Sequence, residues 1–88
     1  MKLKYNFVTN EVADKIVAVA VGGDLEKLNG FIKMNDTGAY IFNMLKSDVT
    51  EEEIVAAMKK DYEDAAEEEI RETVSEFVGK LKEADVLE

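Results

Sequence analysis

The chain has 88 residues, of which 47% are hydrophobic and 35% charged, and its formal net charge is −9. That length predicts one domain spanning residues 1–88, with a single modest core. The sequence contains no Cys and no His. This composition excludes disulfides, thiolate catalysis, zinc sites of the Cys/His kind and imidazole acid-base chemistry.

The charge is unevenly distributed along the chain. Residues 1–35 hold five Lys and four acidic residues, whereas residues 36–88 hold six basic and sixteen acidic residues. Such an acidic surface repels nucleic acid and anionic membrane. No apolar run approaches the roughly 20 residues of a membrane span, and the start "MKLKYNFVTN" lacks the apolar middle of a signal peptide. We therefore expect a cytoplasmic protein that binds neither nucleic acid nor membrane.

The first third of the chain predicts β-strands. Phe7–Val12 and Lys15–Val21 are rich in β-branched residues, and the intervening Ala13 and Asp14 predict a tight turn. In the second strand both alternating sets of side chains are apolar. A strand that is apolar on both faces is expected at the centre of the sheet.

A third strand is predicted at Gly30–Met34, after a Gly-rich break and the short connector "LEKL". The alternation of side chains puts Phe31 and Lys33 on one face, with Ile32 and Met34 on the other. If the strands lie side by side in chain order, this third strand is an edge, with one row of backbone N–H and C=O groups unpaired.

Helical periodicity begins at Asn35. Asn35 or Asp36 can cap the first helix, whose apolar side carries Ile41, Phe42 and Leu45. Thr50 and Glu53 have the spacing of a capping box at the start of a second helix. The buried stripe predicted for this second helix consists of Ile54, Ala57, Met58 and Tyr62.

A third helix is predicted from Ala65 to Ala84, with Asp64 and Glu67 spaced as a second capping pair. Its core-facing residues fall within about 60° of arc at 100° per residue: Ile70, Val74, Phe77 and Leu81. Val78, Arg71 and Ser75 widen one flank of this arc, and the tail at Val86 and Leu87 is expected to pack back on the core.

The order of these elements is βββααα. It predicts an α+β fold, a small winged-helix-like domain in which an N-terminal three-stranded antiparallel sheet is followed by three helices. The last two helices would form the helix-turn-helix pair.

Two features suggest a catalytic or a DNA-binding function. The glutamate runs at 51–53 and 67–69 suggest a metal or catalytic site, but consecutive helical residues point about 100° apart and cannot converge on one ion. Both runs also lie in first turns, where acidic residues favour the helix dipole. The helix pair suggests a winged-helix DNA-binding transcriptional regulator, although the last helix has six Glu against three basic residues.

The edge strand offers a further function. An extended peptide can dock on it as a fourth strand, with backbone bonds to Gly30–Met34 and alternate side chains reaching between this strand and the third helix. The simpler alternative is that solvent or a second copy of the chain covers the edge.

At this point the sequence resembles the PqqD family, the coenzyme PQQ synthesis protein D group, whose fold is also called the RiPP recognition element. The likeness spans nearly the whole chain. It rests on "FIKMNDTGAYIFNML", a strand followed by the pair Met34-Asn35 and a helix, on "VTEEEIVAAMKKDY", a helix ending in Tyr, and on "VSEFVGKLKEADVL", the last helix with its apolar tail.

The resemblance implies a non-catalytic chaperone domain. We expect it to need no cofactor and to be a monomer or weak homodimer. It would bind the leader segment of a ribosomally made precursor peptide and present it to a modifying enzyme, often a radical-SAM enzyme. The leader would add antiparallel to the third strand, against the third helix. Carried over by position, the peptide-binding residues are Gly30, Phe31, Ile32, Lys33 and Met34 on one wall and Arg71, Val74, Ser75 and Val78 on the other.

Overall fold

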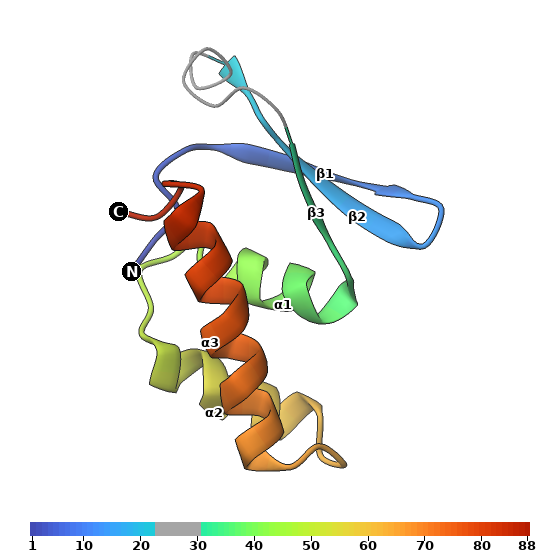
Figure 1. Ribbon diagram of the computed structural model, residues 1–88, viewed down its shortest axis with the longest axis vertical. Coiled ribbons are helices and arrows are strands. Elements are labelled where there is room, and N and C mark those ends of the chain that lie inside the picture. The colour runs from blue at the N-terminus through green and yellow to red at the C-terminus, as the bar shows by residue number, and fades with distance from the viewer. Residues whose placement is uncertain (23–30) are drawn as a thin grey trace.

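The computed structural model describes residues 1–22 and 31–88, and in these ranges the predicted order βββααα is confirmed (Figure 1). The predicted connector and Gly30, the first residue of the predicted third strand, lie outside the described residues. The elements are β1 (Phe7–Val12), β2 (Lys15–Ala20), β3 (Phe31–Met34), α1 (Asp36–Met44), α2 (Glu51–Asp61) and α3 (Glu67–Glu83).

β1 and β2 form the predicted hairpin. Val12 pairs with Lys15, so the turn consists of Ala13 and Asp14 alone. Ala13 has a φ of 57°, a left-handed conformation that costs a residue with a Cβ atom roughly 1 kcal/mol relative to Gly. The hairpin therefore forms despite an unfavourable turn residue.

The three described strands are antiparallel and lie in the order β1-β2-β3, so β2 is central and β3 is an edge, as predicted. The β2–β3 register pairs Ile16 with Met34 and Val19 with Phe31. One face of the sheet is buried and carries Phe7, Ala18, Ala20 and Met34. The opposite face is open, and Phe31 on it is 59% exposed.

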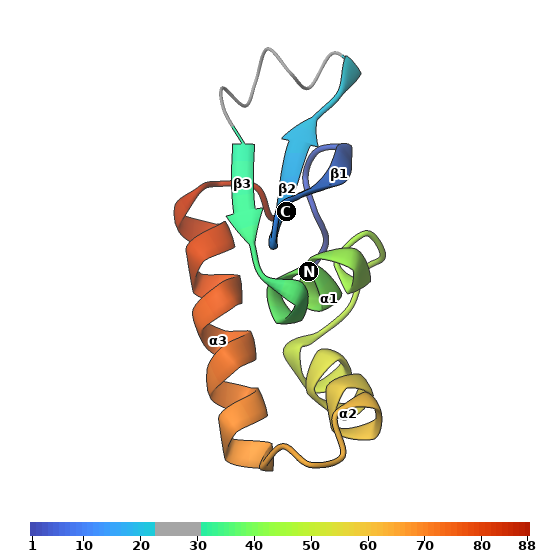
Figure 2. The same ribbon diagram turned by 90° about the vertical axis from the view of Figure 1, so that its right-hand side faces the viewer.

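α1 packs beneath the sheet, between the sheet and α2, and α3 runs alongside them (Figure 2). The Asn35 side chain accepts a hydrogen bond of 2.9 Å from the Gly38 N–H, which identifies Asn35 as the N-cap. The predicted apolar side of α1 is fully buried: Ile41, Phe42 and Leu45.

α2 begins with the predicted capping box. The Thr50 hydroxyl accepts from the Glu53 N–H at 3.1 Å, and the Glu53 carboxylate accepts from the Thr50 N–H at 3.0 Å. Its buried residues are Ile54, Val55 and Met58, whereas Ala57 and Tyr62 are only half-buried. The buried face of α2 is thus rotated slightly toward Val55 compared with the prediction.

The capping pair predicted at the start of α3 is wrong. The N-cap is Ala66, which makes no side-chain cap, because Asp64 lies two residues earlier, in the turn that connects α2 to α3. At the other end, Asp85 takes the left-handed conformation, and the Val86 N–H donates to the Leu81 carbonyl at 3.2 Å. This arrangement turns the C-terminal tail onto the core, where Val86 and Leu87 are buried as predicted.

The N-terminal segment and the C-terminal tail lie side by side (Figure 1). Leu3 bridges to Leu87, and the Lys4 N–H donates to the Val86 carbonyl at 2.7 Å. Among residues 1–22 and 31–88, no helix is both long and apolar enough to cross a membrane.

Candidate functional site

The free edge of β3 is the main feature of the site. Within the described residues β3 pairs with β2 alone, so its second edge has no backbone partner. β3 is the strand on the α3 side of the sheet (Figure 2). An exposed edge of this kind is a template on which another extended chain can form hydrogen bonds.

The side chains of β3 alternate as predicted. Phe31 and Lys33 are exposed on the open face, whereas Ile32 is half-buried and Met34 is 5% exposed. The Lys33 ammonium lies 5.6 Å from the centroid of the Phe31 ring, a cation–π contact. A guest strand would therefore meet an aromatic ring and a cation on one side of the edge.

The residues predicted for the wall on α3 do not line the pocket beside β3. Arg71 bonds Glu52 of α2 at 2.5 and 3.1 Å, so its flank of α3 faces α2. Ser75 is exposed and lies two residues before Phe77, so the two side chains point to nearly opposite sides of the helix. Val74 and Val78 are each 1% exposed and belong to the core.

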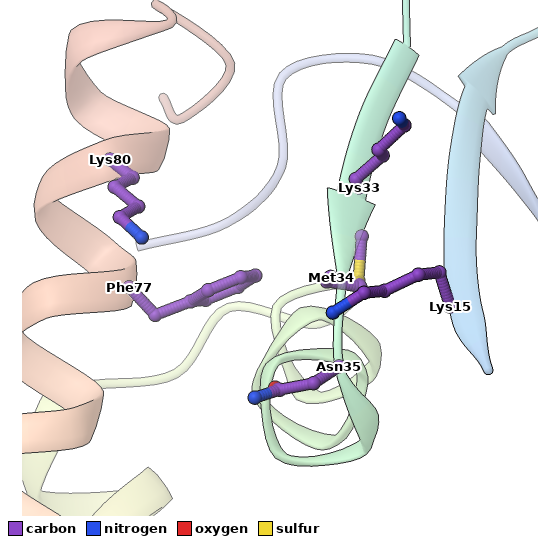
Figure 3. A pocket seen from close by; sticks show the side chains of 6 residues that line it. All are labelled: Lys15, Lys33, Met34, Asn35, Phe77 and Lys80. Carbon is purple, nitrogen blue, oxygen red and sulfur yellow. The ribbon is translucent and has the colours of Figure 1, made fainter.

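The flank of α3 that lies beside β3 carries Phe77 and Lys80. These two side chains line a pocket of about 330 Å³ together with Met34 and Asn35, at the end of β3, and with Lys15 and Lys33. Figure 3 shows the Phe77 ring projecting from α3 toward Met34. Phe77 is half-buried and packs against the core, as predicted, while the rest of its ring lines the pocket.

Gly38 allows Phe77 to approach α1 closely. A Cβ atom at Gly38 would lie 2.9 Å from Phe77 Cε1 and 3.1 Å from Met34 Cβ. Those distances are shorter than ordinary van der Waals contact. The close packing of the Phe77 ring against the end of β3 and the start of α1 therefore requires a residue without a side chain at position 38.

The charges on the α2 side of α3 are paired. Glu67 accepts from Lys59, and its pKa is lowered chiefly by that hydrogen bond. The Arg71 guanidinium likewise lowers the pKa of Glu52 through a hydrogen bond. On α1, the Tyr40 hydroxyl donates to Asp61 of α2, and this bond raises the pKa of Tyr40 to about 12.

The described residues contain no group of three or more Asp, Glu, Cys or His side chains that could hold a metal ion. The site offers instead a backbone ladder, an aromatic ring and several ammonium groups. These groups suit recognition of an extended chain better than bond-making chemistry.

The sequence analysis missed Lys15, Asn35 and Lys80 as residues of the site. Lys80 stands three positions after Phe77, so the two side chains share one flank of α3. That spacing was the available signal, but it could not tell which flank of α3 lies beside the sheet.

Comparison with known proteins decides the family. The family model for coenzyme PQQ synthesis protein D (PqqD) matches residues 15–87, which include β2, β3 and all three helices. The chain belongs to the PqqD family. The resemblance predicted from the sequence is thereby confirmed.

A solved structure shares the PqqD-like fold of this chain. It is TbiB1 in complex with the TbiA(beta) leader peptide, with a TM-score of 0.75 and 22% sequence identity over 100% of this chain and 95% of that chain. At this identity the likeness shows a common fold. A search of curated proteins found no significant match.

Proposed function

We propose that this PqqD-family chain is a non-catalytic adaptor that binds the leader segment of a ribosomally made precursor peptide and presents it to a modifying enzyme. The leader adds as a fourth strand on β3, antiparallel to it, in the space between β3 and α3. The observation that carries this proposal is the unpaired edge of β3 next to the pocket formed with Phe77.

The family and the fold support this proposal from a second direction. TbiB1, which shares the fold, was solved with a leader peptide. The lack of Cys and His in the sequence fits an adaptor rather than a catalyst.

Backbone hydrogen bonds to the edge supply part of the affinity, at about 1 kcal/mol for each net bond. Side chains on alternate positions of the leader supply the rest by packing against Met34 and Phe77. A preformed edge and pocket reduce the ordering cost on the protein side, although the leader itself must still be ordered.

NMR titration tests the proposal directly. The ¹⁵N-labelled protein is titrated with synthetic leader segments of the short precursor peptides encoded beside this gene. We expect the amide signals of Phe31–Met34 and of Phe77–Lys80 to shift together. Shifts confined to other elements, or none at high peptide concentration, would overturn the proposal.

Backbone methylation of the peptide tests the binding mode without altering the protein. In an antiparallel pair, alternate residues of the guest strand direct their N–H groups to the edge. N-methylation at one alternating set of positions should therefore abolish binding, whereas methylation at the other set should leave it nearly unchanged. A uniform effect along the peptide would contradict strand addition.

A further inference from the structure

Three lysines line one pocket at the end of β3, although the Lys33 ammonium is turned toward the Phe31 ring. Lys15 comes from β2, Lys33 from β3 and Lys80 from α3, and all three line the pocket of about 330 Å³. In Figure 3 the Lys15 side chain extends toward Met34 and Asn35, while Lys80 reaches into the space beside β3. The floor of the pocket is apolar, formed by Met34 and Phe77.

These lysines differ from three of the other cations in the described part of the chain. Lys4, Lys59 and Arg71 each pair with a carboxylate. Within the described residues none of the three pocket lysines does so, and the Lys33 ammonium lies over the Phe31 ring. Acidic residues next to residues of the pocket are Glu76, which lines an adjoining pocket, Asp36 in the first turn of α1, and Asp14, which precedes Lys15 in the β1–β2 turn.

An unpaired cluster of cations is unexpected on a chain with a net charge of −9. The protein as a whole repels acidic peptides, so an acidic residue is favoured only where local cations outweigh that repulsion. The lysine pocket is such a place, and it stands at one fixed position along the edge. It can therefore fix the register of a guest strand as well as attract it.

We propose that the lysine pocket, Lys15, Lys33 and Lys80 over Met34 and Phe77, binds an Asp or Glu side chain of the guest peptide. This inference rests on the proposed function and adds a preference for an acidic residue in the bound peptide. The methylene groups of the acidic residue would pack on Met34 and Phe77, and its carboxylate would accept from the ammonium groups.

The position of the pocket predicts where the acidic residue lies in the peptide. Met34 and Asn35 are at the C-terminal end of β3. A guest strand antiparallel to β3 places its N-terminal half at that end, so its own C-terminal carboxylate lies far from the lysines. The carboxylate in the pocket should therefore be that of a side chain in the N-terminal half of the bound segment.

Selection from a displayed peptide library tests this preference. Messenger-RNA-displayed peptides of about 12 random residues are selected on the wild type, on Lys15→Gln/Lys80→Gln and on the matched control Lys60→Gln/Lys82→Gln. Both double variants lose the same charge, but Lys60 and Lys82 are exposed and lie outside the pocket. We expect Asp or Glu to be enriched at one position on the wild type and the control, and the enrichment to be lost on Lys15→Gln/Lys80→Gln.

Matched peptides measure the effect. One enriched sequence is synthesised with Glu or Gln at that position, acetylated and amidated at its ends, and titrated by fluorescence anisotropy. The Glu form should bind the wild type about fivefold more tightly than the Gln form, with a smaller ratio at higher salt. On Lys15→Gln/Lys80→Gln the two forms should bind equally.

The outcomes separate the two proposals. Peptides that bind at β3 without an acidic preference would overturn the lysine pocket and leave the adaptor function standing. An acidic preference that survives in Lys15→Gln/Lys80→Gln, or that requires a free C-terminal carboxylate, would also overturn it. If no β3-dependent peptide is enriched on any form, the proposed function falls as well.

Discussion

The two flanks of α3 differ in whether their charged groups already have partners. On the flank toward α2, Arg71 pairs with Glu52, and Glu67 pairs with Lys59. On the flank toward β3, Lys80 has no carboxylate partner within the described residues, and Phe77 is only half-buried. The first flank packs against α2, whereas the second packs against α1 through Phe77 and lines the pocket beside β3.

The difference shows how one amphipathic helix can serve both the fold and recognition. Exposed ion pairs such as those toward α2 contribute little to stability, so they orient the helices more than they hold them together. The flank with unpaired charges can bind a ligand without breaking ion pairs within the protein. Substitutions on the two flanks, and in the core between them, should therefore have separable effects.

The largest effect is expected in the core between the flanks. Val78 is 1% exposed, so Val78→Asp buries an unpaired charge and should cost about 3 kcal/mol or more, enough to unfold much of the protein. Ser75→Asp is the matched control, because Ser75 is exposed on the same helix. Urea denaturation followed by circular dichroism measures both. A stably folded Val78→Asp variant would show that this position is not core.

Phe77→Ala should separate binding from stability. The ring is half-buried, so its loss should lower the free energy of unfolding by about 1–2 kcal/mol, less than for a fully buried Phe. Peptide affinity should fall about tenfold or more, because the ring forms the α3 side of the pocket. Isothermal titration calorimetry measures the affinity, and Phe77→Leu, which keeps an apolar side chain, should restore part of it. Unchanged affinity in Phe77→Ala would place the peptide elsewhere.

A smaller but opposite pair of effects is expected from Lys80→Gln and Arg71→Gln. Lys80→Gln should weaken binding of an acidic peptide about threefold and leave the melting temperature nearly unchanged. Arg71→Gln removes the bonds to Glu52 and should lower the melting temperature by about 4 °C or less, without changing peptide affinity. Thermal melts and fluorescence anisotropy of both variants check the contrast. If Arg71→Gln weakened binding as much as Lys80→Gln, the assignment of the flanks would be reversed.

The smallest effect concerns pH. Hydrogen bonds from Arg71 and Lys59 hold the pKa values of Glu52 and Glu67 below their ordinary value of 4.5 in the folded protein. A carboxyl with a lowered folded pKa stabilises the fold fully above its unfolded pKa, and this stabilisation is lost as the pH falls through the folded pKa. The free energy of unfolding should thus decrease with falling pH below about 4.5 less steeply in Arg71→Gln than in the wild type.

Denaturation curves at a series of pH values from about 3 to 6 measure that slope. Lys60→Gln is the control, since Lys60 is exposed near the end of α2 and forms no ion pair within the described residues. Identical slopes for Arg71→Gln and the wild type would show that the Arg71 bonds do not stabilise the fold.

The sequence alone determined the elements and their order. β-Branched residues marked β1 and β2, and the capping box of Thr50 and Glu53 marked the start of α2, because these signals lie within a few neighbouring residues. The chain order also predicted that β3 is an edge. The capping pair predicted at the start of α3 does not form. Asp64 and Glu67 have the required spacing, but Asp64 lies in the connecting turn, two residues before the N-cap.

Only the tertiary structure decided which flank of α3 faces β3. The apolar arc of α3 allows the helix to be rotated about its axis by a few tens of degrees in either direction. The rotation that is adopted depends on contacts between residues distant in the sequence. Gly38 admits the Phe77 ring beside Met34, and Glu52 draws Arg71 toward α2. The lysine pocket arises the same way, because Lys15, Lys33 and Lys80 come from three elements that no local pattern connects.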